Sequence, residues 1–173
     1  PQSPTPSARH TAGAASSKSG NKVAHGAFWV MVRRVTVVAA CVDLAFLFLF
    51  LALGSPVLAW LNVASIGMYA AANWLLRTRR NFPALLLIWL EVLGHAALGS
   101  MLVGWDSGFH YYLLMFIPAI VVSGRRGTTL LLLGLLLSFY LALHFASGYF
   151  GVLEPLGGTG LAVVHTINVA IVF

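Results

Sequence analysis

The stretch that decides the fold is residues 56–103, PVLAWLNVASIGMYAAANWLLRTRRNFPALLLIWLEVLGHAALGSMLV. It contains two apolar runs, at about 56–76 and 82–103, separated by the basic turn RTRR at 77–80. Each run is close to the roughly 20 residues that an α-helix needs to cross a bilayer. Because backbone polar groups find no partners in lipid, such runs joined by short turns predict membrane-spanning α-helices and not barrel strands.

Four further apolar runs flank this pair, at about 35–53, 108–123, 128–147 and from about 160 onward. We therefore expect an all-α, polytopic membrane protein with six transmembrane helices. The run at 108–123 is near the lower limit of about 17 residues, and Pro118 predicts a kink in it. The sixth run is too short to cross before Phe173, so we expect a truncated helix and a longer native protein.

The basic residues predict the orientation, because all ten Lys and Arg fall on one side of the predicted membrane. They are Arg9, Lys18, Lys22, Arg33, Arg34, Arg77, Arg79, Arg80, Arg125 and Arg126. The alternate loops, near Gly54, Trp105 and Gly157, contain none. By the positive-inside rule, the N-terminus is expected in the cytoplasm.

Composition excludes an ordinary soluble domain: 60% of the residues are hydrophobic and 8% are charged. The net charge of +6 lies in short clusters at the ends of the runs, which favours anionic lipid headgroups over nucleic acid as partner.

Residues 1–26, rich in Pro, Ser, Ala and Gly, predict a disordered cytoplasmic tail before a membrane domain at 27–173. The single cysteine, Cys41, allows no disulfide framework and no cysteine-based metal motif.

Polar residues within the apolar runs are the candidate functional residues, because an ionisable group in lipid is costly. Asn62, Ser65, Tyr69 and Asn73 have helical spacing and predict one polar face. They either provide hydrogen bonds between helices or form a proton or ligand path with Asp43.

Glu91 and His95 are one helical turn apart and share a face. Either they satisfy each other inside the bundle, or Glu91 orients a histidine whose other nitrogen binds a ligand.

Four histidines lie on four different runs, all in the predicted outer half of the bilayer: His95, His110, His144 and His165. Imidazoles at similar depth on neighbouring helices can be the axial ligands of a haem. Without CxxCH the haem would be b-type. Its iron would be held by His95 with His165 or by His110 with His144, and the sequence does not choose between these pairs. Glu91 would lie behind the ligands, and Trp105 and Asp106 would shape the outer mouth. A small-molecule or proton-sensing site and purely structural histidines are the alternatives; zinc fits less well because thiolates are lacking.

The run Gly104–Pro118, GWDSGFHYYLLMFIP, precedes a basic turn and a run with Tyr140 and His144. Over about residues 30–173 the chain resembles the six-helix N-terminal membrane domain of bacterial nucleotide cyclases. The resemblance is to diguanylate cyclases of the GGDEF class first and to class III adenylate cyclases second. It implies a homodimer in the bacterial inner membrane and a catalytic domain after residue 173, since no catalytic motif occurs here.

We accordingly expect a transmembrane sensory input domain in which haem reduction, or binding of a quinone or lipid, shifts the sixth helix. The rival hypotheses are a passive membrane anchor and dimerisation module, and a small transporter or proton pathway using Asp43, Glu91 and the histidines. The transporter is less favoured because no internal repeat is evident.

Overall fold

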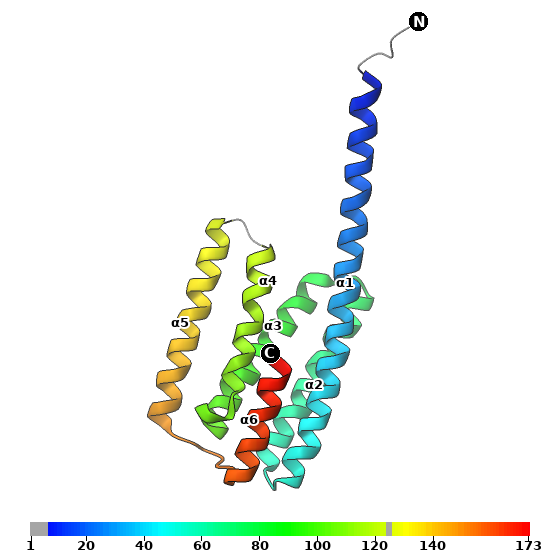
Figure 1. Cartoon of the computed structure of the whole chain (residues 1–173). Coiled ribbons are helices and arrows are strands. Elements are labelled where there is room, and N and C mark those ends of the chain that lie inside the picture. The colour runs from blue at the N-terminus through cyan, green and yellow to red at the C-terminus, as the bar shows by residue number, and fades with distance from the viewer. Residues whose placement is uncertain (1–6, 124–125) are drawn as a thin grey trace, which may run out of the picture.

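The computed structural model describes residues 7–123 and 126–173, which form helices joined by short connections (Figure 1). The helices are α1 Ser7–Ala52, α2 Pro56–Arg77, α3 Asn81–Val103, the 3-10 helices η1 Trp105–Ser107 and η2 Phe109–Met115, α4 Phe116–Ser123, α5 Arg126–Phe150 and α6 Gly158–Val172. The prediction of an all-α fold is confirmed for the described part. The bounds of α2 and α3 lie within a residue or two of those predicted from hydropathy.

The first helix is much longer than the apolar run within it. α1 extends back to Ser7, and its apolar part is Gly26–Ala52. The side chains of residues 1–25 lie outside the described part of the chain, as does Arg125. The disorder predicted for residues 1–26 stays a prediction.

Three helices are long and apolar enough to cross a membrane: Gly26–Ala52 of α1, Asn81–Val103 and Arg126–Phe150. The segments Phe109–Val122 and Gly158–Val172 are apolar but shorter. α2 has 22 residues, but the polar residues along one of its faces reduce its mean hydropathy. The fold is therefore compatible with a membrane protein.

The fourth apolar segment changes helix type along its length. It is a 3-10 helix from Phe109 to Met115 and an α-helix from Phe116 to Ser123, with Pro118 in the first α-helical turn. Proline lacks an N–H and its ring clashes with the carbonyl four residues earlier, so the α-helix cannot continue far back through this point. Where Pro118 predicted a kink, the structure has a change from a 3-10 helix to an α-helix two residues before the proline.

Two apolar clusters hold the helices together. The larger one joins five elements through Phe46, Phe50, Leu58, Ala59, Val103, Phe109 and Val164. The smaller one joins α3, η2 and α5 through Ala96, Leu113 and Leu143. α3 and η2 each contribute to both clusters and so link the two halves of the bundle.

α5 lies at one edge of the bundle and α1 at the other (Figure 1). In the most apolar part of α5 only 6% of the residues are buried inside the protein. Large side chains such as Leu130, Phe145 and Tyr149 are exposed along it. An apolar surface this extensive on a single helix is expected of a helix that faces lipid or another chain.

Candidate functional site

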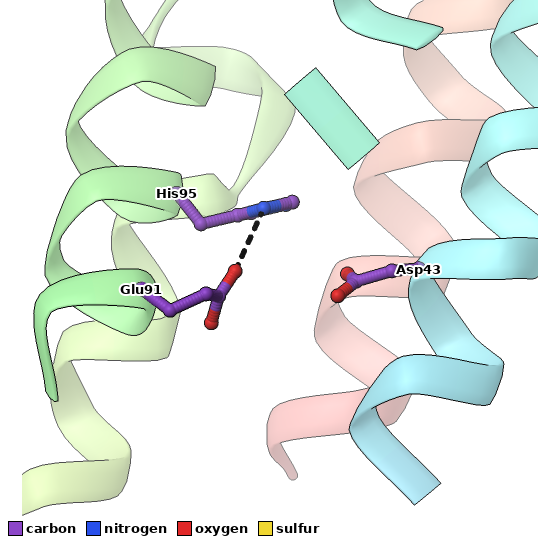
Figure 2. A group of neighbouring side chains, drawn as sticks. All are labelled: Asp43, Glu91 and His95. Carbon is purple, nitrogen blue, oxygen red and sulfur yellow. Dashed lines mark ion pairs between the residues drawn. The ribbon is translucent and has the colours of Figure 1, made fainter. Parts of the chain in front are cut away.

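A polar cluster of three side chains lies between α1 and α3 (Figure 2). Asp43 comes from α1, and Glu91 and His95 come from α3. One ligand atom from each lies within 4.8 Å of those of the other two, and the Nδ1 atom of His95 is 3.4 Å from Oε1 of Glu91. All three are buried, at 6%, 4% and 7% exposure, so the protein holds two carboxyl groups and one imidazole away from solvent.

α2 closes the cluster with its polar face. Ser65 Oγ lies 3.2 Å from Nδ1 of His95 and forms a hydrogen bond with it. Tyr69, one turn further along α2, hydrogen-bonds Glu91. The predicted polar face of α2 is thus confirmed, and it points at the pair on α3 that was predicted to share a face.

The other two members of that face serve different contacts. Asn73 donates to Oγ1 of Thr36 and to the carbonyl of Arg33, at 3.3 and 3.4 Å, which ties α2 to α1. Asn62 donates to the carbonyl of Leu58 within its own helix, at 2.7 Å. Asn73 therefore provides structural hydrogen bonds between helices, whereas Ser65 and Tyr69 support the cluster.

Asp43 differs from the other members of the cluster because one of its oxygens is unsatisfied. Its Oδ2 atom is buried and has no hydrogen-bond partner among the described residues, although the side chain points toward Glu91 and His95 (Figure 2). An unpartnered buried polar atom costs about 1–3 kcal/mol, and more for a charged group. This oxygen therefore calls for a partner that the protein itself does not supply.

His110 and His144 are brought together around a single ring. The imidazole of His110 stacks on the indole of Trp105 at a centroid distance of 3.8 Å, and the imidazole of His144 meets the same indole edge-on at 4.6 Å. A cavity of about 330 Å³ borders Trp105 and His144. The indole of Trp105 thus contacts both imidazoles.

His165 and Asn168, both on α6, hold the turn that follows α3. Nδ1 of His165 lies 2.8 Å from the carbonyl oxygen of Asp106, so this nitrogen donates to that oxygen. Asn168 donates to the carbonyl of Ser107 at 2.9 Å. The Asp106 carboxylate itself is exposed. Two side chains of α6 thus satisfy two successive backbone carbonyls of η1.

Sequence reasoning missed Asn168, which is fully buried and has two partners. Besides the carbonyl of Ser107, it accepts a hydrogen bond from the hydroxyl of Tyr112 at 3.0 Å. The Tyr112 ring in turn meets the His95 ring edge-on at 5.8 Å. A polar amide within an otherwise apolar run was the signal that could have identified it, by the argument applied to α2.

The four predicted haem ligands consequently have three different surroundings. His95 belongs to the cluster with Asp43 and Glu91, His110 and His144 flank Trp105, and His165 caps the η1 turn. In the described part of the chain, the one group of three or more His, Cys, Asp or Glu with metal-compatible spacing is Asp43, Glu91 and His95. Cys41 is exposed.

Comparison of this chain with protein-family models, with curated proteins and with solved structures finds no match.

Proposed function

We propose that this chain is a multi-pass membrane domain with six crossings and a cytoplasmic N-terminus. Three helices long and apolar enough to cross support this proposal. So does the distribution of Lys and Arg, which occur in alternate connections only. α2, the η2–α4 segment and α6 would be the remaining crossings, with α2's polar face turned to the bundle interior.

We further propose that the domain is a sensory input module whose site is the cluster of Asp43, Glu91 and His95. The single observation that carries this proposal is the unpartnered, buried Oδ2 of Asp43 facing Glu91 and His95. Intramembrane ionisable residues are rare and usually functional, because lipid disfavours them strongly. Because the cluster's residues come from separate helices, a species that binds to them can change how those helices pack.

α6 is the element through which such a change would leave the bundle. The His95 ring contacts the Tyr112 ring, and the Tyr112 hydroxyl donates to Asn168 of α6. A ligand that pulls His95 toward Asp43 would change the packing of Tyr112 and hence the support of α6. Such coupling requires the ligand to bind one helix arrangement better than the other.

The resemblance to the membrane domains of bacterial nucleotide cyclases supplies the proposed output. In that view the protein works as a homodimer in the inner membrane, and α6 leads to a cytoplasmic diguanylate cyclase or, as second choice, an adenylate cyclase domain. Exposed apolar side chains along α5 offer a surface on which a second copy or lipid can pack.

The experiment is to join residue 173 in helical register to a cytoplasmic cyclase reporter and to measure cyclic nucleotide formation in membrane vesicles. Asp43→Asn keeps the shape of the side chain and removes the charge. We expect it to change the output at least severalfold, whereas Asp106→Asn, the same change at an exposed carboxylate, should leave the output unchanged. Immunoblots of the vesicles control for the amount of inserted protein.

The rival function, a passive anchor and dimerisation module, predicts a different result. Replacement of the bundle by an unrelated dimeric anchor would then preserve the output, and Asp43→Asn would have no effect. That pair of results would refute the sensory proposal. Ion flux in proteoliposomes that disappears in the Asp43→Asn variant would instead support a proton or ion pathway.

Haem b is a second candidate for what the domain binds. The observation that favours it is that His110 and His144 both contact Trp105, which borders a cavity together with His144. Protein made in haem-replete cells should then show a Soret band and sharpened α and β bands after dithionite. Their absence would remove haem and redox sensing from the proposal.

A further inference from the structure

We propose that Asp43, Glu91 and His95 bind one divalent transition-metal ion of the Zn²⁺, Mn²⁺ or Fe²⁺ class between α1 and α3. This inference rests on the proposed function, because it names the ligand of the same site. It makes the metal ion the species that the domain detects or requires, and it assigns the three side chains as ligands.

The spacing of the three side chains fits such an ion. Zinc bonds to imidazole nitrogen and carboxylate oxygen are about 2.0–2.2 Å long, so neighbouring ligand atoms of a tetrahedral site lie roughly 3.4 Å apart. His95 Nδ1 and Glu91 Oε1 are 3.4 Å apart. The ligand atoms of all three residues lie within 4.8 Å, so the carboxylate of Asp43 needs to approach by no more than about 1.5 Å, which rotation of one side chain provides.

The unpartnered oxygen of Asp43 is an independent indication of a ligand. Oδ2 is buried, lacks a hydrogen bond and lies on the side of α1 that faces the pair on α3 (Figure 2). The side chain is 6% exposed, so water does not compensate it from the surface. A cation between Asp43 and Glu91 would supply the missing partner.

The charge of the cluster supports a divalent ion in particular. Two ionised carboxylates and a neutral imidazole carry a charge of −2, which a divalent cation neutralises. Among the described residues, no Lys or Arg forms a salt bridge with either carboxylate. Buried charges in proteins are usually paired or bound to a metal, because isolated charges are strongly disfavoured away from water.

One surrounding residue orients a ligand as a metal site requires, because Tyr69 hydrogen-bonds Glu91. Partners of this kind are common behind metal ligands, and losing one costs about 10–100-fold in affinity. Ser65 bonds Nδ1 of His95, the nitrogen that the metal would use, so its hydroxyl would turn away when the ion binds. Three protein ligands also leave a fourth coordination position for water or a signal molecule.

The donor set selects the class of metal. One imidazole and two carboxylates suit Zn²⁺, Mn²⁺ or Fe²⁺, whereas Cu⁺ prefers sulfur ligands. Ca²⁺ prefers six to eight oxygen ligands. The mixed nitrogen and oxygen set therefore points to a transition metal.

The test uses the whole chain in lipid nanodiscs, with any affinity tag removed, and Zn²⁺ in equilibrium dialysis as the probe. We expect one tightly bound Zn²⁺ per chain. Asp43→Asn, Glu91→Gln and His95→Gln should each lower the affinity at least about 100-fold, and Tyr69→Phe about tenfold. Asp106→Asn and Glu154→Gln are the matched controls, and they should bind Zn²⁺ like the wild type.

X-ray absorption at the zinc edge of the wild-type protein gives a measurement that needs no variant. One imidazole with oxygen ligands and no sulfur is expected. Absence of stoichiometric binding by the wild type would overturn the metal proposal, as would binding that survives in all three ligand variants. Circular dichroism identifies any variant that fails to fold. In that case the X-ray absorption spectrum of the wild-type protein decides whether the metal proposal stands.

These results separate the two proposals. If the wild type binds no metal but Asp43→Asn still changes cyclase output in the fusion, the sensory function stands and the metal ligand is wrong. If Zn²⁺ binds at the three residues and neither Zn²⁺ nor Asp43→Asn changes the output, the metal site stands and the sensory function fails.

Discussion

Gly94 and Gly99 show how differently two identical residues on one helix are used. A methyl group added at Gly99 would run into the ring of Phe109, whereas one added at Gly94 would meet nothing within 4 Å. Gly99 thus permits the close approach of η2 to α3, and Gly94 has no such role. Small residues commonly allow close packing of membrane helices.

We therefore predict opposite effects of alanine at these two positions. Gly99→Ala should destabilise the bundle by about 1–3 kcal/mol, because Phe109 has to move within a packed core. Gly94→Ala should be neutral or stabilise by up to about 1 kcal/mol, because alanine favours the helix. The midpoint of unfolding as SDS is titrated into detergent-solubilised protein measures both. Equal midpoints for the two variants would contradict the packing described for η2.

Residue spacing allowed some parts of the site to be predicted and not others. Glu91 and His95 share a face because they are one turn apart, and the same rule gives the face of Asn62, Ser65, Tyr69 and Asn73. That Asp43 faces Glu91 and His95 depends on the rotation of α1 about its axis, which periodicity within α1 cannot determine. Likewise, the contacts of His110 and His144 with Trp105 depend on the irregular path of η1 and η2.

At the scale of elements, hydropathy predicted the ends of α2 and α3 closely, but it predicted neither the start of α1 at Ser7 nor the 3-10 helix in the fourth segment. The 3-10 conformation of η2 follows from Pro118 and from burial of its side chains by neighbouring helices. It also lengthens the segment: seven residues at the 3-10 rise of about 2.0 Å, against 1.5 Å for an α-helix, gain roughly 3.5 Å. The segment formed by η2 and α4, which is short for a bilayer crossing, is therefore longer than an α-helix with the same number of residues.

The attachment of α6 to η1 and η2 leads to a prediction for that helix. Asn168→Leu should leave the carbonyl of Ser107 and the hydroxyl of Tyr112 without their partner, at a cost of about 1–3 kcal/mol. Hydrogen exchange in α6 should become faster, which mass spectrometry of the protein in nanodiscs would measure.

Thr166→Val is the matched control for this change, because Thr166 bonds only to the carbonyl of Ala162 in its own helix among the contacts described. Its exchange should resemble that of the wild type. Slow exchange in the Asn168→Leu variant would show that apolar packing of Val164 and its neighbours is enough to hold α6.

For the whole molecule, the proposed orientation can be tested by labelling single cysteines in a Cys41→Ser background. Gly157→Cys lies in a connection without basic residues, where an added side chain meets nothing within 4 Å. A membrane-impermeant maleimide should label it in intact spheroplasts. Thr78→Cys, in the basic turn, should be labelled only after the membrane is opened. The reverse pattern would invert the proposed topology.

The dependence of the η1 turn on α6 has a consequence for biogenesis. In the proposed topology α6 would enter the membrane after the other elements described, because ribosomes release helices in chain order. Until α6 docks, the carbonyls of Asp106 and Ser107 lack the donors that His165 and Asn168 later provide. Lipid offers no substitute for those donors. An intermediate without docked α6 would therefore keep this turn near water or beside an insertase, and docking of α6 would complete the assembly of the turn.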